Sequence, residues 1–344
     1  MPVPISVLIP CFNVEKYLSE ALQSILRQSY QNLIILVLDD GSTDNTLDIA
    51  QQFSVKDERV KIHRNIKNMG IIASRNKLLE LCETDIAAWM DADDIAVPSR
   101  IEQQLGFLSS HPECVNCTCH FYRKNNLSKK LVAIPHQYLS PEYLLFYNHI
   151  LNPGSMFRVD ICRKNKVRFR TEISGASDYL FWVELSKFGE IGLVEEPLMV
   201  YREHSGQETI AQKYRQNQGC LEIVQSQLKV FDCEAETEVL ARMLVYPAET
   251  LNLDFNLSYM KRSACIIKTI LQALPKSKYN QEQVRQLLMG MFRRQAWRNG
   301  LLGLLIFLNV FGIEGLKNSR NFGFDLLKQA IAFDFRRVIH FFKR

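Results

Sequence analysis

Ile86-Ala-Ala-Trp-Met-Asp91-Ala-Asp93-Asp94 is a short apolar run that ends in three carboxylates within four positions. An apolar run of this length is typical of a buried strand and is short for a helix. Carboxylates this close together repel one another unless a cation or hydrogen bonds compensate their charge. Hard oxygen ligands suit Mg²⁺ or Mn²⁺, which bind carboxylates together with substrate phosphates. The stretch therefore predicts a site for a metal-bound diphosphate, although taken alone it also fits a solvated acidic turn that caps the next helix.

The sequence around this stretch alternates short apolar runs with helical patterns. Further buried strands are expected at residues 5–10, 33–38 and 60–63. Helices are expected after Asn13 as an N-cap, near Thr46, after Gly70, and with Pro98 in the first turn of a fourth helix. Strands that alternate with helices form a parallel sheet with right-handed crossovers. We therefore expect an α/β fold with a Rossmann-like nucleotide-binding sheet flanked by helices.

Polar residues follow three of the expected strands, at residues 10–13, 39–42 and 91–94. In parallel sheets ligands bind at the carboxyl ends of the strands, so these loops should converge on one site. Asp40 can accept hydrogen bonds from a nucleobase or a ribose, and Gly41 permits a tight turn. Arg75 should lie on a helix facing the same crevice, where a guanidinium can bind diphosphate oxygens. A helix-capping loop at residues 39–44 and a surface arginine remain the alternatives.

Strand patterns fade after about residue 220, and helical patterns take over at residues 236–244, 263–274 and 281–291. We place a boundary near residue 230. The prediction is an α/β catalytic domain over residues 1–230 and a mainly helical C-terminal extension over residues 231–344.

Composition narrows the class of protein. The 344 residues are 47% hydrophobic and 23% charged, which fits a globular protein. An odd number of cysteines, nine, favours free thiols in a reducing compartment. The start of the chain lacks a signal-peptide pattern, and no apolar run reaches the length of about 20 residues that spans a bilayer. We expect a cytoplasmic protein with no nucleic-acid partner.

The net charge of +5 is concentrated at the C-terminal end, where residues 291–344 carry 10 Lys/Arg against 3 Asp/Glu. An apolar cluster in this region is flanked by cations. The cluster comprises Trp297, Leu301, Leu302, Leu304, Leu305, Phe307 and Leu308, and the cations are Arg293, Arg294, Arg298, Arg336, Arg337, Lys343 and Arg344. Such a composition suits peripheral contact with the inner face of an anionic membrane. Packing of the same helix on the catalytic domain is the alternative.

Four stretches together resemble the family 2 glycosyltransferases, which have the GT-A-type fold. They are Ser6-Val-Leu-Ile-Pro-Cys-Phe-Asn13, Val37-Leu-Asp-Asp-Gly-Ser-Thr-Asp44, Asn68-Met-Gly-Ile-Ile-Ala-Ser-Arg-Asn76 and Trp89-Met-Asp-Ala-Asp-Asp94. The resemblance covers about residues 3–210. It implies that Asp40 reads the nucleobase, with Pro10, Phe12 and Asn13 on the neighbouring loop as further nucleotide-binding residues. It also implies that Arg75 and Asp91 lie at the diphosphate and that Asp93 binds the metal directly.

Two later stretches extend the resemblance. Ser177-Asp-Tyr-Leu-Phe-Trp182 places Asp178 where the family has its catalytic base, although Ser177 replaces the usual preceding glutamate. Tyr201-Arg-Glu-His204 is similar to the family's closing motif, which makes His204 a candidate neighbour of the metal or the phosphates. A helix N-cap at Asp178 and a packed loop histidine at His204 are the alternatives.

The resemblance implies an inverting reaction. A carboxylate deprotonates an acceptor hydroxyl, which attacks the sugar of a nucleotide-diphosphate donor, and Mn²⁺ or Mg²⁺ neutralises the departing diphosphate. The expected donor is a UDP-sugar. The expected acceptor is a glycan or a lipid-linked glycan in the synthesis of cell-envelope polysaccharide.

The sequence leaves few competing functions. A nucleotide-sugar-binding partner subunit without turnover fits the same stretches, but the retained Asp40, Asp93 and Asp178 favour an enzyme. A dinucleotide-dependent oxidoreductase would need G-x-G-x-x-G after the first strand, and the sequence lacks it. Cys114, Cys117 and Cys119 suggest half of a zinc site, but their spacing fits small residues of a half-buried strand better.

Overall fold

The strands expected in the first 90 residues form the parallel half of a nine-stranded sheet. They are β1 (Ile5–Cys11), β2 (Leu33–Asp39), β3 (Val60–Arg64) and β4 (Ile86–Trp89). Their order is β3-β2-β1-β4, and all three pairings are parallel. Nearly every residue of β1, β2 and β4 is buried, as continuous apolar runs require in a sheet covered on both faces.

The structure, a computed structural model, describes residues 2–173, 175–204, 213–233, 239, 257–298 and 300–311. The chain forms two compact units, Met1–Gly219 and Cys220–Arg344. The parallel strands and the acidic stretch belong to the first unit.

The other half of the sheet departs from the all-parallel prediction. It contains β5 (Ile95–Ala96), β6 (Cys114–Lys124), β8 (Met156–Arg158) and β9 (Glu190–Arg202), and β7 (Lys129–Val132) pairs with β6. The short strand β8 lies between β4 and β6 and runs antiparallel to both. The alternation of strands and crossover helices stops after β4, so the rule for parallel sheets no longer applies.

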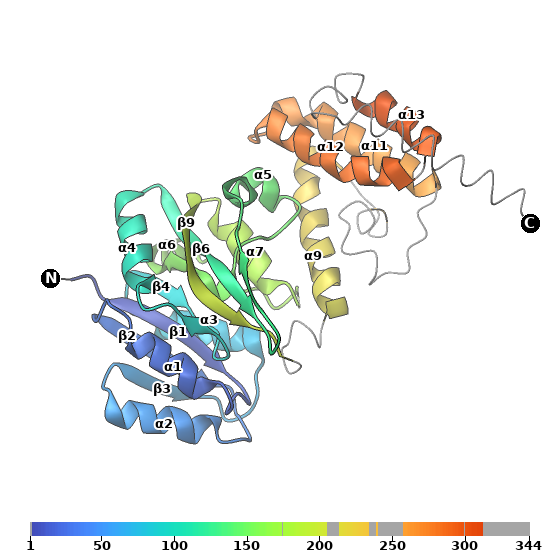
Figure 1. Ribbon diagram of the computed structural model, residues 1–344. Coiled ribbons are helices and arrows are strands. Elements are labelled where there is room, and N and C mark those ends of the chain that lie inside the picture. Colours follow the sequence, from blue (N-terminus) through green and yellow to red (C-terminus); the bar gives the residue numbers. More distant parts are fainter. Residues whose placement is uncertain are drawn as a thin grey trace, which may run out of the picture. The chain divides into compact units, whose positions relative to one another are not determined.

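Helices cover both faces of this sheet (Figure 1). α1 (Leu18–Leu26), α2 (Thr46–Lys56) and α4 (Arg100–Ser110) lie on one face, and α3 (Ile71–Leu81), α6 (Val159–Asn165) and α7 (Ser177–Leu185) lie on the other. Shorter turns of helix precede β8. They are η1 (His136–Leu139), α5 (Pro141–Leu144) and η2 (Asn152–Gly154).

Two predicted helix starts are wrong. Tyr17, not Asn13, is the N-cap of α1, because Asn13 has φ of 51° and turns the chain four residues before the helix. Pro98 precedes the N-cap Ser99 of α4 instead of lying in its first turn. The predicted start at Thr46 is confirmed.

An aromatic cluster fixes the end of β4 against α7. The ring of Trp89 stacks on Phe157 of β8 at 5.7 Å and meets Phe169 edge-on at 5.5 Å. Phe181 of α7 stacks on Phe169 at 4.4 Å, and Trp182 contacts Phe157. All five side chains are fully or almost fully buried. Because Trp89 is the last residue of β4, this packing fixes where the acidic stretch leaves the sheet.

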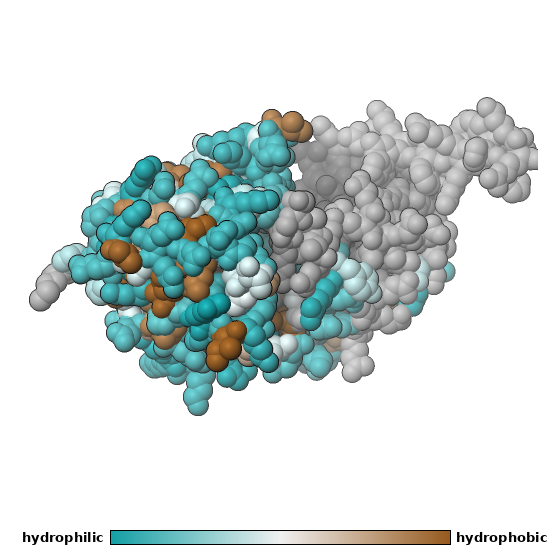
Figure 2. All heavy atoms as spheres, turned by 90° about the horizontal axis from the view of Figure 1, so that it is seen from below, coloured by the Kyte–Doolittle hydropathy of each residue, from teal (hydrophilic) through white to brown (hydrophobic). Residues whose placement is uncertain are grey.

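The surface of the first unit is mixed on the face that Figure 2 presents. Hydrophobic residues appear there singly or in small groups among hydrophilic ones. Scattered exposed apolar side chains are normal for a soluble surface, and this face has no broad apolar area.

The second unit is helical where it is described. α9 (Lys213–Leu228) leads into η3 (Lys229–Phe231), and α11 (Leu257–Ala273), η4 (Leu274–Lys276), α12 (Gln281–Arg298) and α13 (Gly300–Phe311) follow. The helices expected at residues 263–274 and 281–291 are confirmed as parts of α11 and α12. The helix expected at residues 236–244 lies outside the described residues except for Val239, which is helical.

Part of the C-terminal apolar cluster packs within this unit. Phe307 of α13 is fully buried, and its ring lies 6.4 Å from that of Phe292 on α12. Leu305 remains 54% exposed. The side chains of residues 293–304 and all residues beyond Phe311 lie outside the described residues, including Arg336, Arg337, Lys343 and Arg344. Among the described helices, none is long and apolar enough to cross a bilayer.

Candidate active site

The carboxyl ends of β1, β2 and β4 meet, as the sequence predicts. Cys11 ends β1 and pairs in register with Asp39, which ends β2. The buried thiol of Cys11 has its pKa raised far above the usual range, first by burial and then by the charges of Asp39, Asp93 and Asp91. The acidic residues of two strand ends therefore lie close to the end of a third.

The acidic stretch after β4 is a candidate metal site. Carboxylate oxygens of Asp91, Asp93 and Asp94 all lie within 4.8 Å of one another. Asp91 and Asp93 are partly exposed, whereas Asp94 is fully buried. A ligand arriving from solvent can therefore reach the first two carboxylates.

Asp94 is turned inward and holds the end of β9. Its Oδ1 accepts a hydrogen bond from the backbone N–H of Arg202 at 2.9 Å, and the guanidinium of Arg202 donates to the backbone carbonyl of Asp93. The same guanidinium forms an ion pair with Glu20 at 2.5 Å. Burial, followed by the charges of Asp91 and Asp93, raises the pKa of Asp94 well above its usual range.

Asp91 pairs with Arg75 and lies within electrostatic range of Asp178. Burial raises the pKa of Asp91 to about 6, the charge of Arg75 opposes that rise, and the charges of Asp93 and Asp178 add to it. Nη2 of Arg75 lies 3.6 Å from Oδ1 of Asp91. The side chain of Arg75 is only 12% exposed, and its guanidinium lies 5.5 Å from the centre of the Phe169 ring.

Asp178 lies in the first turn of α7 and is half-buried. The helix begins at Ser177 with Ala176 as its N-cap, so Asp178 is not the capping residue. A carboxylate in the first helical turn also gains from the positive end of the helix dipole. Ser177, which replaces the family's glutamate, is buried.

His204 contacts the acidic stretch directly. Its Nε2 lies 2.9 Å from Oδ2 of Asp93, and its ring stacks on Tyr17 at 4.3 Å between ring centres. The histidine follows β9, whose last residue Arg202 is tied to Asp94. The closing motif therefore reaches the acidic stretch at two points.

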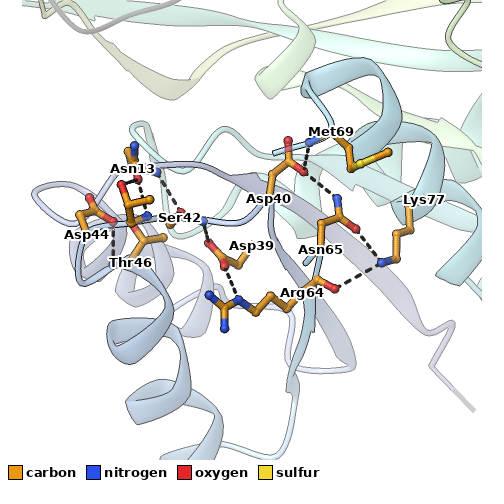
Figure 3. A network of polar contacts seen from close by, with 11 residues as sticks. Asn13, Asp39, Asp40, Ser42, Asp44, Thr46, Arg64, Asn65, Met69 and Lys77 are labelled. Carbon is orange, nitrogen blue, oxygen red and sulfur yellow. Dashed lines mark hydrogen bonds and ion pairs between the residues drawn. The ribbon is translucent and has the colours of Figure 1, made fainter. Parts of the chain in front are cut away.

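Asp40 organises the loop before α3 (Figure 3). Its Oδ1 accepts hydrogen bonds from the amide of Asn65 at 2.7 Å and from the backbone N–H of Met69 at 2.9 Å. Its Oδ2 accepts from the N–H of Gly70 at 2.8 Å, and Gly70 is the N-cap of α3. Asp40 thus anchors the start of the helix that carries Arg75.

The loop after β1 is tied to the loop after β2 (Figure 3). The N–H of Asn13 donates to Oγ of Ser42 at 3.0 Å, and Oδ1 of Asn13 accepts from the N–H of Thr43 at 2.9 Å. Phe12 on this loop is 42% exposed. Pro10 lies buried inside β1 and not on the loop where we expected it. Because β1 has no registered partner on β4 beyond Leu8, Pro10 can occupy the next-to-last position of the strand without disrupting that pairing.

Several residues that build the site were not singled out from the sequence. Asn65 binds Asp40, Tyr17 stacks on His204, and Arg202 holds the acidic stretch. Because Arg202 lies inside the closing motif, its position in the sequence could have marked it as a residue of the site. Asn65 and Tyr17 lie in loops without any pattern that distinguishes them.

The cysteines of β6 do not form a zinc site in the part of the chain that the structure describes. Cys114, Cys117 and Cys119 are buried in the strand, as small core residues, and all residues from 114 to 119 are buried, so this part of the strand is fully rather than half buried. Cys114 can join Glu113 and Glu190 in a potential metal group, but Cys117 and Cys119 belong to no such group.

Comparison with known proteins agrees with this geometry. Residues 6–169 match the family described as glycosyl transferase family 2. An uncharacterized glycosyltransferase of Haemophilus influenzae is 34% identical over 227 residues, which cover 62% of this chain and 70% of that protein. The putative teichuronic acid biosynthesis glycosyltransferase TuaG of Bacillus subtilis is 36% identical over 104 residues, covering 30% of this chain and 41% of TuaG.

A solved structure shares the fold. A crystal structure of S. aureus TarS in complex with UDP-GlcNAc matches with a TM-score of 0.59 and 18% identity, covering 90% of each chain. The fold is thus the GT-A-type α/β fold, and the protein is a glycosyltransferase enzyme. The chain belongs to glycosyl transferase family 2.

Proposed function

We propose that this enzyme transfers a sugar, with inversion, from a nucleotide-diphosphate donor to a hydroxyl of a cell-envelope glycan or lipid-linked glycan. A UDP-sugar is the proposed donor, because TarS, which shares the fold, was crystallised with UDP-GlcNAc. A cell-envelope acceptor is proposed because TuaG is named for teichuronic acid biosynthesis.

The proposal rests most on the side chains that meet at the acidic stretch, where Nη2 of Arg75 lies 3.6 Å from Oδ1 of Asp91 and Nε2 of His204 lies 2.9 Å from Oδ2 of Asp93. Asp178 comes from α7 and Asp91 from the end of β4, yet the charge of Asp178 contributes to the raised pKa of Asp91. A carboxylate beside a diphosphate site is the arrangement that a general base for an acceptor hydroxyl requires.

The roles follow from position and charge. Asp178 takes the proton of the acceptor hydroxyl, and the hydroxyl oxygen attacks the anomeric carbon while the bond from that carbon to the diphosphate breaks. Arg75, close to Asp91, binds diphosphate oxygens. The positive character that develops on the sugar in the transition state is favoured by nearby carboxylates.

The nucleoside is proposed to bind at the loops after β1 and β2. Phe12 offers an exposed ring for the base, and Asn13 holds the two loops together. Asp40 already accepts three hydrogen bonds, and a carboxylate offers about four acceptor sites. One site remains for a donor group of the base or ribose. Pro10 lies inside β1, immediately before the loop that carries Phe12 and Asn13, and supports that loop.

The acidic stretch fits a divalent ion, with Mn²⁺ and Mg²⁺ as the candidates. Asp91 and Asp93 would hold it, with His204 next to Asp93, because both residues are partly exposed and their carboxylate oxygens lie within 4.8 Å of each other. The buried Oδ2 of Asp94 has no hydrogen-bond partner among the described residues, and a bound cation would relieve the repulsion among the three carboxylates. When bound, such an ion neutralises the charge that develops on the leaving diphosphate.

A panel of nucleotide-sugars tests the proposal, with release of the nucleoside diphosphate measured in the presence of Mn²⁺ or Mg²⁺. One donor should be turned over, and Asp93→Ala should abolish release. Asp178→Asn should bind that donor with unchanged affinity but lose transfer to an acceptor. Glu113→Gln, in the other acidic group, is the matched control and should change neither.

Two results would contradict the proposal. Donor binding without turnover for any nucleotide-sugar would favour the alternative of a non-catalytic binding subunit. Full activity in Asp178→Asn would remove this residue as the base.

A further inference from the structure

The hairpin between β6 and β7 carries an unusual charge arrangement. Residues 123–130 contain four cations and no acid. Arg123 lies directly opposite Lys130, and Lys124 lies directly opposite Lys129. All four side chains are exposed. Like charges placed directly opposite each other destabilise a pair of strands, so this arrangement lowers the stability of the hairpin.

Compensation within the chain is partial. Nε of Arg123 lies 3.4 Å from Oε1 of Glu203, and the ammonium of Lys129 lies 4.1 Å from the centre of the Tyr122 ring. Lys124 and Lys130 make no ion pair with the residues that the structure describes. The hairpin is therefore a cationic surface that an anionic partner would stabilise.

The tip of the hairpin is held by hydrogen bonds to one side chain and presents an apolar residue. Oδ1 of Asn125 accepts hydrogen bonds from the N–H of Leu127 at 3.0 Å, the N–H of Ser128 at 2.8 Å and the hydroxyl of Ser128 at 3.2 Å. Leu127 is 96% exposed between the cations, and Leu131 is 55% exposed. A turn fixed in this way loses little conformational entropy when it binds.

Protection of a sheet edge explains only part of this surface. β7 pairs with β6 alone, and lysines on such an edge discourage unwanted strand pairing. That role accounts for Lys129 and Lys130. It does not account for Arg123 and Lys124, because β6 pairs with β7 on one side and with β9 on the other. An exposed leucine at the tip works against edge protection.

The hairpin adjoins the candidate active site through Lys124, the last residue of β6 before the turn. Lys124 is the register partner of Arg202 on β9, and the backbone N–H of Arg202 donates to Asp94. Both β6 and β9 end at this edge of the sheet (Figure 1). A surface bound by the hairpin would therefore lie beside the site.

We propose that residues 123–130 dock the enzyme on an anionic lipid membrane. The cations contact the lipid headgroups, and Leu127 enters the boundary with the acyl chains. A soluble anionic glycan would use the cations but would leave Leu127 without a partner, so the lipid surface fits both parts of the hairpin. This contact is separate from the C-terminal cations and brings lipid-linked acceptors to the edge that holds Asp93.

The test is flotation of the full chain with vesicles of phosphatidylcholine, with and without phosphatidylglycerol. The protein should bind only the anionic vesicles, and binding should weaken with added salt. Combined Lys124→Gln, Lys129→Gln and Lys130→Gln should weaken binding at least about tenfold, because each cation near an anionic surface contributes separately. Leu127→Ser should weaken it about threefold or more.

Matched controls remove equal charge and apolar area elsewhere on the first unit. Combined Lys16→Gln, Lys56→Gln and Lys61→Gln removes three exposed cations, and Val55→Ser changes a side chain that is 88% exposed. Both controls should bind vesicles as the unmodified protein does. Thermal unfolding of each variant checks that it folds.

Three outcomes would overturn the proposal. The first two are unchanged vesicle binding in the hairpin variants and a loss of binding in the lysine control as large as in the hairpin variants. The third is binding of soluble polyphosphate by the hairpin together with unchanged vesicle binding in Leu127→Ser. The last would identify a site for a soluble polyanion instead. Because flotation needs no donor, its failure is distinguishable from failure of the proposed transferase reaction.

Discussion

Nε2 of His204 lies 2.9 Å from Oδ2 of Asp93, although 111 positions separate the two residues in the chain. The histidine is held from its other side by the ring of Tyr17, 4.3 Å away. The loop before α1, the end of β4 and the segment after β9 therefore meet at one carboxylate. If Asp93 holds the proposed ion, this contact orients a metal-binding carboxylate, and loss of such a partner commonly lowers activity by about 10-fold to 100-fold.

Two substitutions of His204 separate hydrogen bonding from stacking. His204→Gln keeps a hydrogen-bond donor for Asp93, and His204→Phe keeps the ring on Tyr17. We expect turnover to fall by about 10-fold to 100-fold in His204→Phe and by less in His204→Gln, because Asp93 needs the polar contact. Steady-state kinetics with the donor measure both. Equal losses would show that the contact with Asp93 is not the important one.

Gly41 is expected to tolerate no side chain. Its φ is 73°, and an added Cβ would lie 2.7 Å from the backbone carbon of Lys67. Gly41→Ala should lower the unfolding free energy by at least about 1–3 kcal/mol, because both the left-handed backbone and the close approach oppose it. It should also weaken donor binding, since Asp40 is the neighbouring residue.

Gly106 provides the control for Gly41. It lies in α4, and a Cβ added at this position would have no neighbouring atom within 4 Å. Gly106→Ala should stabilise the helix by about 0.5–1 kcal/mol. Chemical unfolding of both variants measures the difference. A Gly41→Ala variant as stable as Gly106→Ala would contradict the geometry at residues 41 and 67.

The stability of the first unit should depend on the protonation of His149. Its imidazole lies among the rings of Tyr138, Tyr143 and Tyr147, and burial lowers its pKa below the ordinary 6.5. A depressed histidine pKa means that the unfolded chain binds the proton first as pH falls. Stability should therefore be full above pH 6.5 and should decrease as pH falls through the lower, folded-state value.

His149→Gln should flatten this part of the pH dependence. The difference between the variant and the unmodified protein is measured as Tm over a pH series around and below 6.5. The exposed His136, on the preceding η1, gives the matched control, because His136→Gln leaves the buried imidazole in place. The same slope in His149→Gln and the unmodified protein would rule out this source of pH dependence.

Much of the parallel half of the sheet could be predicted from sequence, because continuous apolar runs such as residues 33–38 mark strands buried on both faces. The strand β8 could not, since three residues give no periodicity. Asp91 and Arg75 were predicted to share a crevice, and they lie 3.6 Å apart. That success came from the rule that parallel strands gather their carboxyl ends at one edge.

The remaining errors share a physical cause, which is that local patterns do not reveal tertiary partners. Asparagine is a common N-cap residue, but the side chain of Asn13 accepts a hydrogen bond from the N–H of Thr43, 30 positions away. Cys117 and Cys119 suggested a half-buried strand, but residues 114–119 are all buried, and Sγ of Cys117 lies against the carbonyl of Gln104 in α4. Arg100, at the start of α4, has the sequence context of an exposed residue and is fully buried.

Arg100 is a buried cation without an ion-pair partner among the described residues. Its Nη2 donates to the backbone carbonyl of Trp89 at 2.8 Å, and its Nε donates to Gln104 at 3.0 Å. A weaker contact reaches the carbonyl of Ser155 at 3.4 Å. Since Trp89 is two residues before Asp91, this guanidinium fixes the backbone from which the acidic stretch departs.

Two substitutions of Arg100 distinguish the need for charge from the need for a planar group of donors. Arg100→Lys keeps the charge, but one ammonium cannot reach Trp89, Gln104 and Ser155 together, so unfolding free energy should fall by about 3 kcal/mol or more. Arg100→Met removes the buried charge and leaves the acceptors of Trp89 and Gln104 unpartnered, at about 1–3 kcal/mol each. Burying the unmatched charge is the larger penalty, so the Met variant should be the more stable of the two in urea unfolding. Arg123→Met, which alters the ion pair of an exposed arginine with Glu203, should change stability by about 1 kcal/mol or less. If Arg100→Lys were instead the more stable variant, the property that matters at this position would be the positive charge near Asp91 and Asp94.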